Sequence, residues 1–185
     1  MKSLAVFASG TGTNFVAIAK ACASDVINAR VALLVCDKPG APVLDRAREL
    51  GVEAFAFSAR DYASKADYEA EIVRLLDERK VDLVCLAGYM RIVGETLLKA
   101  YEGKIINIHP SLLPAFRGAN AVEQAVAYGV KVYGITIHWV NSDLDGGKII
   151  AQRAFSYEGS DPAEVHRIGQ KIEHELYVET INKIL

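Results

Sequence analysis

The sequence predicts an α/β protein with a Rossmann-like, mostly parallel central sheet that carries helices on both faces and becomes mixed toward the C-terminal half. Short continuous apolar runs alternate with helical patterns along the chain, and such runs fit strands that are covered on both faces. Near the C-terminus two apolar runs, 132–140 and 148–155, follow each other without a helix, which favours an antiparallel pair. No repeat or linker divides the 185 residues, so we expect a single domain, residues 1–185.

The individual elements follow from the same patterns. The predicted strands before the antiparallel pair are residues 4–7, 31–35, 52–57, 83–86 and 105–108. Apolar residues recur at helical spacing in 15–22, 68–76, 121–128 and 165–176. Gly129 is placed to end the third of these helices, and Asp161 followed by Pro162 is placed to begin the last.

Composition excludes several classes of function. The net charge is −2 with both signs mixed, so we expect no nucleic-acid partner. No apolar run is long enough for a membrane span or a signal peptide. The three cysteines have no CxxC spacing, which fits a reducing compartment and a cytoplasmic protein. These features leave monomer and homodimer equally open.

A glycine-containing loop, residues 9–14, follows the first strand and precedes a helix. Gly12 lets the backbone turn sharply, and Thr13 and Asn14 add polar groups at the helix N-terminus, where a phosphate is favoured. The loop is neither a GxGxxG fingerprint nor a P-loop. An ordinary strand-to-helix turn and a phosphate site are about equally supported.

Asn107 and His109 stand two residues apart at the end of a strand, so their side chains share a face. An amide can donate to a developing oxyanion, and an imidazole can transfer a proton near neutral pH. The alternative is a histidine that only bonds to the backbone at the strand end. The other histidines show no metal-binding spacing with His109, so we expect no metal.

Three weaker signals remain. Asp145 precedes two glycines, which is typical of a hairpin turn, but its carboxylate could instead orient His109 and favour the protonated imidazole. His138 lies within a strand, and we expect it to be structural. Residues 88–93 could wall a flat apolar pocket, with Arg91 meeting an acidic group, or could only pack a strand against a helix. Glu173 lies beside the apolar stripe of the last helix and matters only if the glycine loop faces it.

Taken together, five segments resemble the phosphoribosylglycinamide formyltransferases of the folate formyltransferase group. They occur in the family's order and spacing over nearly the whole chain: SGTGTN at 9–14, AGYMRI at 87–92, NIHPSLLP at 107–114, FRG at 116–118 and LDGG at 144–147. The Asn-x-His and Asp set resembles the signature of the wider group, and the SGTGTN loop points to the purine enzyme within it.

The resemblance implies formyl transfer from 10-formyltetrahydrofolate, the formyl-donor cosubstrate, to the amine of glycinamide ribonucleotide in purine synthesis, without a metal. It implies that residues 1–100 or so bind the nucleotide phosphate and that residues 101–185 carry catalysis and folate binding. The implied catalytic residues are Asn107, His109 and Asp145. The implied ribonucleotide-binding residues are Gly12, Thr13, Asn14 and Glu173. The implied folate-binding residues are Lys65, Met90, Arg91, Ile92, Val93 and Asn107.

The chain departs from the family pattern at Val122, where many relatives have His, at Lys148 and Val178, where relatives often have Pro, and in its early end at Leu185. Three other functions remain open from the sequence. They are formyl transfer to a sugar nucleotide or aminoacyl-tRNA, hydrolysis of formyltetrahydrofolate, and nucleotide binding without catalysis.

Overall fold

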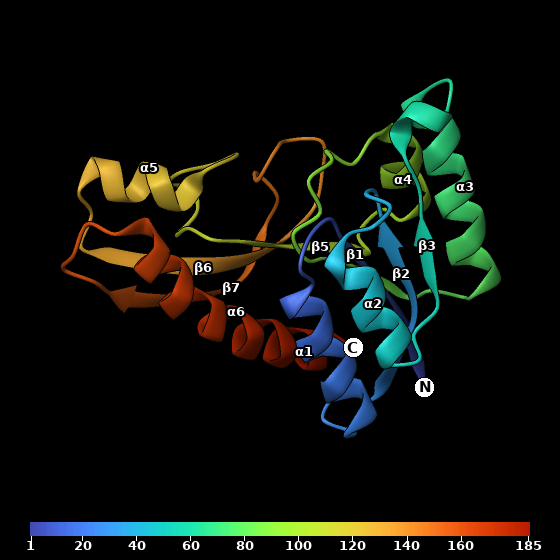
Figure 1. Cartoon of the computed structure of the whole chain (residues 1–185), viewed down its shortest axis with the longest axis horizontal. Helices are drawn as coiled ribbons and strands as arrows, with labels where there is room; N and C mark the ends of the chain where they lie inside the picture. Colours follow the sequence, from blue (N-terminus) through green and yellow to red (C-terminus); the bar gives the residue numbers. More distant parts are fainter.

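The computed structural model describes all of residues 1–185, which form one seven-stranded sheet with helices on both faces (Figure 1). The strands are β1 (Lys2–Ala8), β2 (Ala29–Cys36), β3 (Ala54–Ala56), β4 (Leu83–Leu86), β5 (Ile105–His109), β6 (Val132–Trp139) and β7 (Ile149–Ser156). Their order is β3-β2-β1-β4-β5-β6-β7. The first five run parallel, whereas β6 pairs antiparallel with both β5 and β7. The mixed sheet expected from the sequence is confirmed.

The helices are α1 (Thr13–Ala23), α2 (Pro42–Glu49), α3 (Lys65–Glu78), α4 (Glu95–Ala100), α5 (Ala121–Tyr128) and α6 (Pro162–Ile184), with a 3-10 turn at Ala59–Asp61. Helices α1, α2 and α6 bury apolar residues against one face of the sheet, and α3 and α4 bury theirs against the other. Figure 1 shows the long α6 running from beside α5 along β6 and β7 to α1. Helix α6 thereby brings the C-terminal part of the chain beside the first βα unit.

Local signals at two helix ends act as the sequence indicates. Gly129 adopts φ 88° directly after α5, a left-handed conformation that suits glycine. The carboxylate of Asp161 accepts from the N–H of Ala163 at the start of α6, and Pro162 occupies the first turn, where its missing N–H costs nothing. No helix has the length and apolar character needed to cross a membrane.

Two helices and one strand boundary differ from the sequence prediction. Helix α2 has eight residues and buries only Val43 and Ala47, and the six-residue α4 buries only Leu97, so each offers fewer apolar positions than the helices recognised from their spacing. The N-terminus of α4 depends instead on the buried carboxylate of Glu69 in α3, which accepts from the N–H groups of Gly94 and Leu97. Strand β3 covers three residues rather than the predicted 52–57 because it pairs only with β2, at the edge of the sheet.

Candidate active site

A cleft of about 670 Å³ opens where the carboxyl ends of β4 and β5 meet the N-terminal turn of α1 and the turn that follows β6. Ligands in open α/β sheets bind outside these strand ends. Most of the residues expected to bind or react line this cleft: Asn14, Met90, Arg91, Ile92, Val93, Asn107, His109, Asp145 and Glu173. Gly12, Thr13 and Lys65 are not among its lining residues. The fold therefore gathers residues from five separate segments of the sequence into one site.

The polar centre of the cleft is formed by two histidines, an asparagine and an aspartate. In β5, Asn107 and His109 share a face, as the alternation of strand residues predicts. Strand β6 places His138 directly opposite Asn107, and the Asn107 Nδ2 and His138 Nε2 atoms are 3.2 Å apart. The Asp145 carboxylate lies 3.5 Å from His109 Nδ1 and 3.7 Å from His138 Nε2. The sequence missed His138 as a member of this cluster, because only the register between β5 and β6 reveals it.

Asp145 is ionised in a largely enclosed position. Its side chain is 7% exposed, and burial opposes ionisation, but the N–H of Gly118 and the neighbouring His109 hold the pKa of the carboxyl below its usual range. The Gly118 N–H donates to Asp145 Oδ2 at 2.8 Å. This hydrogen bond connects the loop after β5 to the turn after β6. Asp145 therefore links two loops of the site in addition to lying in the turn.

The geometry distinguishes the two ring nitrogens of His109. Its Nε2 lies 2.8 Å from the carbonyl oxygen of Phe116, and because a carbonyl only accepts, Nε2 carries a proton and donates. Nδ1 is the nitrogen that faces Asp145. With a side chain only 6% exposed, His109 acts in surroundings where electrostatic interactions are weakly screened.

The glycine loop joins the cleft through Asn14. The Asn14 Nδ2 donates to the Glu173 carboxylate at 3.0 Å, which links α1 to α6. Burial raises the pKa of Glu173, although Asn14 and, more weakly, His166 act against the shift. Thr13 Oγ1 accepts from Gln170 in the same helix pair at 3.3 Å. The sequence indicated that Glu173 matters only if the glycine loop faces it, and the structure shows that it does.

Gly12 is held to glycine by packing within the protein. It adopts φ 73° before α1, and an added Cβ would stand 2.3 Å from Cγ2 of Val43 and 2.7 Å from its Cβ. Any side chain at this position collides with α2, so we expect a substitution here to harm packing as well as any ligand that approaches the loop.

Residues 88–93 form one wall of the cleft, with Met90 70% and Ile92 62% exposed. Such exposure of large apolar side chains is typical of a binding surface. Arg91 lines the cleft, and the acidic group that its side chain meets is within the protein, because its Nε lies 3.0 Å from Asp37. Lys65 donates to the Ile92 carbonyl at 2.8 Å from outside the wall.

A buried polar connection, which the sequence analysis missed, links this wall to the glycine loop. Ser9 Oγ donates to Asp37 and accepts from the Met90 N–H at 2.9 Å. Asp37 is 5% exposed and also contacts Arg91. The two loops that approach the cleft from β1 and β4 are thereby fixed relative to each other through the end of β2.

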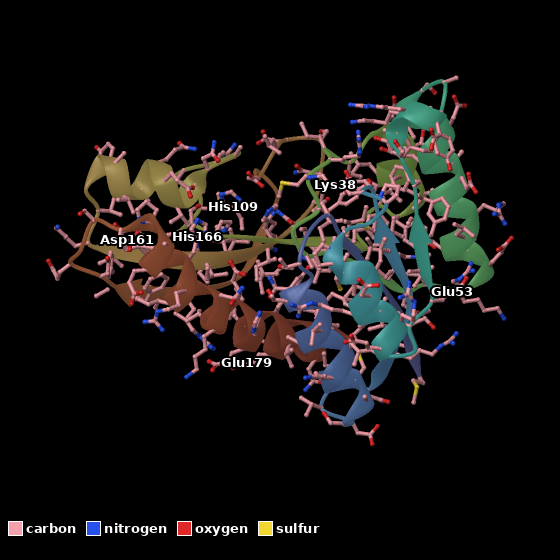
Figure 2. The ribbon with its side chains drawn as sticks, viewed as in Figure 1. Lys38, Glu53, His109, Asp161, His166 and Glu179 are labelled. Atoms are coloured by element: carbon pink, nitrogen blue, oxygen red, sulfur yellow. The ribbon has the colours of Figure 1, made fainter.

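The edge of the cleft between α5 and α6 carries the first departure from the family pattern. Val122 is buried, lines the cleft and packs in a small apolar cluster with Tyr133 and Val165. Beside it, His166 of α6 lies 2.9 Å from Glu123 of α5, and Figure 2 shows His166 near His109. The other departures lie outside the cleft lining: the Lys148 carbonyl accepts from the Trp139 N–H, and Val178 packs on the core.

Comparisons with known proteins identify the family of this chain. The family profile described as Formyl transferase matches residues 2–181. Phosphoribosylglycinamide formyltransferase of Bacillus subtilis (strain 168) is 50% identical, with 100% of this chain and 95% of that protein covered. Glycinamide ribonucleotide transformylase 1 from Geobacillus kaustophilus has a crystal structure with a TM-score of 0.97 and 52% identity, covering 100% of this chain and 99% of the other. Phosphoribosylglycinamide formyltransferase from Bacillus halodurans gives 0.96 and 49%, covering 100% and 95%. The chain therefore belongs to the formyl transferase family, as its sequence motifs indicated.

Proposed function

We propose that this enzyme transfers a formyl group from 10-formyltetrahydrofolate to the amine of glycinamide ribonucleotide, a step of purine synthesis, with Asn107, His109 and Asp145 as its catalytic groups. The observation that carries the proposal is the convergence of these three side chains in one cleft with the Asn14–Glu173 pair. The relatives that match over the full chain bear the name of this activity. The three cysteines are free, which suits a cytoplasmic enzyme.

The reaction begins when the amine of the ribonucleotide attacks the formyl carbon and a tetrahedral oxyanion forms. Asn107 donates an N–H to this oxygen, and protonated His109 adds positive charge beside it. The proton lost by the attacking amine reaches the departing folate nitrogen as the C–N bond to folate breaks. Because Nε2 of His109 is committed to Phe116, Nδ1 is the nitrogen that exchanges the proton, directly or through a water held by Asp145. Much of the rate enhancement comes from holding two substrates together.

In the proposed arrangement the ribonucleotide occupies the α1–α6 side of the cleft. Its phosphate lies at the α1 N-terminus, where Gly12, Thr13 and Asn14 present N–H and side-chain donors. Glu173 accepts from the ribose hydroxyls. Glu173 lies in residues 101–185 but adjoins Asn14 of residues 1–100, so both proposed halves of the chain contribute to the proposed nucleotide site.

The folate is proposed to lie against residues 90–93 and the 140s turn, whose Leu144 is 50% exposed. Asn107 stands where the two substrates meet. Arg91 supports this wall from behind through Asp37. Lys65 is proposed to bind the glutamate tail of the folate. To do so, it would give up its hydrogen bond to the Ile92 carbonyl oxygen.

An acceptor panel tests the proposal. We would supply 10-formyltetrahydrofolate and compare glycinamide ribonucleotide, its dephosphorylated nucleoside, a sugar-nucleotide amine and water as acceptors. We expect rapid formylation of the ribonucleotide, a much higher KM for the nucleoside and negligible hydrolysis. Preferred formylation of the sugar amine, or hydrolysis at a comparable rate, would contradict the proposed acceptor. Equal KM values for nucleotide and nucleoside would remove the phosphate site.

A further inference from the structure

His138 is buried in the cleft wall, and the mechanism above gives it no task. Its side chain is 3% exposed, and its ring touches Asn107 on one side and the backbone of Trp139 on the other. The proton positions on this buried imidazole are determined by which of its two polar neighbours can donate a hydrogen bond and which can only accept one.

The backbone fixes one nitrogen. His138 Nδ1 lies 2.9 Å from the Trp139 carbonyl oxygen, and because a carbonyl only accepts, Nδ1 carries the proton. Gly147 packs directly against this carbonyl, since a Cβ added at Gly147 would stand 1.6 Å from the Trp139 oxygen. Only a residue without a side chain lets the turn close so tightly over the end of β6.

The other nitrogen then decides the orientation of Asn107. In a neutral imidazole with its proton on Nδ1, Nε2 is an acceptor. The Asn107 amide nitrogen at 3.2 Å is within hydrogen-bond distance, whereas the Asp145 oxygen at 3.7 Å is not. Only the NH₂ end of the amide can donate to Nε2, so the amide cannot rotate by 180° without losing this bond.

We propose that His138 is a positioning residue for the reaction. It holds the Asn107 amide with its NH₂ group turned inward, so that the second N–H is free for the formyl oxygen in the cleft that Asn107 lines. The chain of contacts runs from Gly147 through the Trp139 carbonyl and the His138 ring to the Asn107 amide. The inference rests on the proposed oxyanion role of Asn107. A freely rotating amide would spend part of its time presenting its carbonyl oxygen to a developing negative charge.

Matched substitutions of His138 separate positioning from packing. Gln at 138 can place an amide oxygen near the former Nε2 position and accept from Asn107, whereas Leu fills similar space without an acceptor. We expect His138→Leu to lower kcat about 10²-fold, the scale of a misplaced catalytic group, with both KM values nearly unchanged. His138→Gln should recover most of the loss. In an Asn107→Ala background, His138→Leu should cost little more. Equal losses in the Gln and Leu variants, or additive losses with Asn107→Ala, would overturn the inference.

The proton position gives a readout that does not depend on activity. In the wild-type protein at neutral pH, ¹⁵N NMR of the histidine side chains should show His138 as the Nδ1–H tautomer. An Nε2–H tautomer would overturn the inference even if every variant were inactive. Full activity of Asn107→Ala would instead refute the proposed role of Asn107, while the NMR result would still report the contact between the two residues. The two failures are therefore distinguishable.

Discussion

The two ends of the cleft are built in different ways. At the β5–β6 end, side chains carry the chemistry: Asn107, His109, His138 and Asp145 lie within hydrogen-bonding or ion-pairing reach of one another and are largely enclosed. At the α1 end, Asn14 and Glu173 line the cleft, and the loop that leads to Asn14 is constrained by packing, because Gly12 leaves no room for a side chain against Val43. Substitutions at the first end should change kcat, and those at the second should change KM or stability. Variants at the two ends should therefore differ in which of these quantities changes.

The largest effect is expected at His109. His109→Asn removes the proton-exchanging Nδ1 beside Asp145 while keeping a polar side chain. We expect kcat to fall by about 10²–10⁴, the usual scale for a lost general acid–base group, with little change in either KM. Steady-state kinetics measures this directly. His174→Asn, at a histidine outside the cleft lining, is the matched control and should keep wild-type kcat. Full activity in His109→Asn would refute the mechanism.

How far the sequence anticipates this site depends on how each contact is encoded. Asn107 and His109 share a face by simple alternation along one strand. His138 joins them only through the antiparallel register between β5 and β6, which no local pattern specifies. Asp145 reaches His109 from a turn, and the resemblance to the family, more than any spacing, pointed to it.

The same distinction explains the fold. Strands β1, β2, β4 and β5 contain continuous apolar runs, and these runs predict the strands directly. Helix α4 depends on Glu69, which lies in a different helix and caps it across space. Asp37 connects the two loops of the cleft from the end of β2 without any motif of its own. Contacts between residues that are distant in the sequence, such as these, cannot be predicted from local sequence patterns.

Asp145 should give the next largest effect. Asp145→Asn keeps the shape but removes the charge beside His109 and weakens the acceptor of the Gly118 N–H. We expect a loss of about 10–10³ in kcat with little change in the ribonucleotide KM. The double variant with His109→Asn should be little worse than His109→Asn alone, because the two groups act as one unit. Strictly additive losses would show that Asp145 acts independently of His109.

Gly12 tests the loop that leads to the α1 end of the cleft. Gly12→Ala should lower the free energy of unfolding by about 1–3 kcal/mol, because its Cβ meets Val43 and the backbone has positive φ. Val43→Ala removes Cγ2, the nearest colliding atom, but keeps Cβ, so Gly12→Ala should cost less in the Val43→Ala background than in the wild type. Denaturant titration gives the four stabilities. Gly10→Ala is the matched control, because nothing lies within 4 Å of its added Cβ. Failure of Val43→Ala to relieve any of the loss would show that the collision with Val43 Cγ2 does not constrain position 12.

The smallest effect is expected at Glu173, where binding and stability should change in opposite directions. Burial is the main cause of the raised pKa of this carboxyl, with Asn14 and His166 opposing it. The folded protein therefore holds the Glu173 proton more tightly than the unfolded chain does. The stability contributed by the protonated form is fully present below the unfolded pKa and is lost as pH rises through the higher folded pKa. At neutral pH the buried carboxylate consequently costs stability.

Glu173→Gln removes this cost while keeping a side chain of the same shape. We expect the variant to unfold at a higher temperature than the wild type at neutral pH, with the difference shrinking as the pH approaches 4, where the wild-type carboxyl is also protonated. Its ribonucleotide KM should rise about 10-fold at neutral pH, since a charged acceptor for the ribose hydroxyls is lost. In the wild type the same KM should rise as the pH falls through the Glu173 pKa. Thermal melts and ribonucleotide KM measured over the same pH series check both halves. A variant that is less stable at neutral pH, or that binds the ribonucleotide equally well at every pH, would show that the carboxylate is a structural link to Asn14 and not a ligand for the substrate.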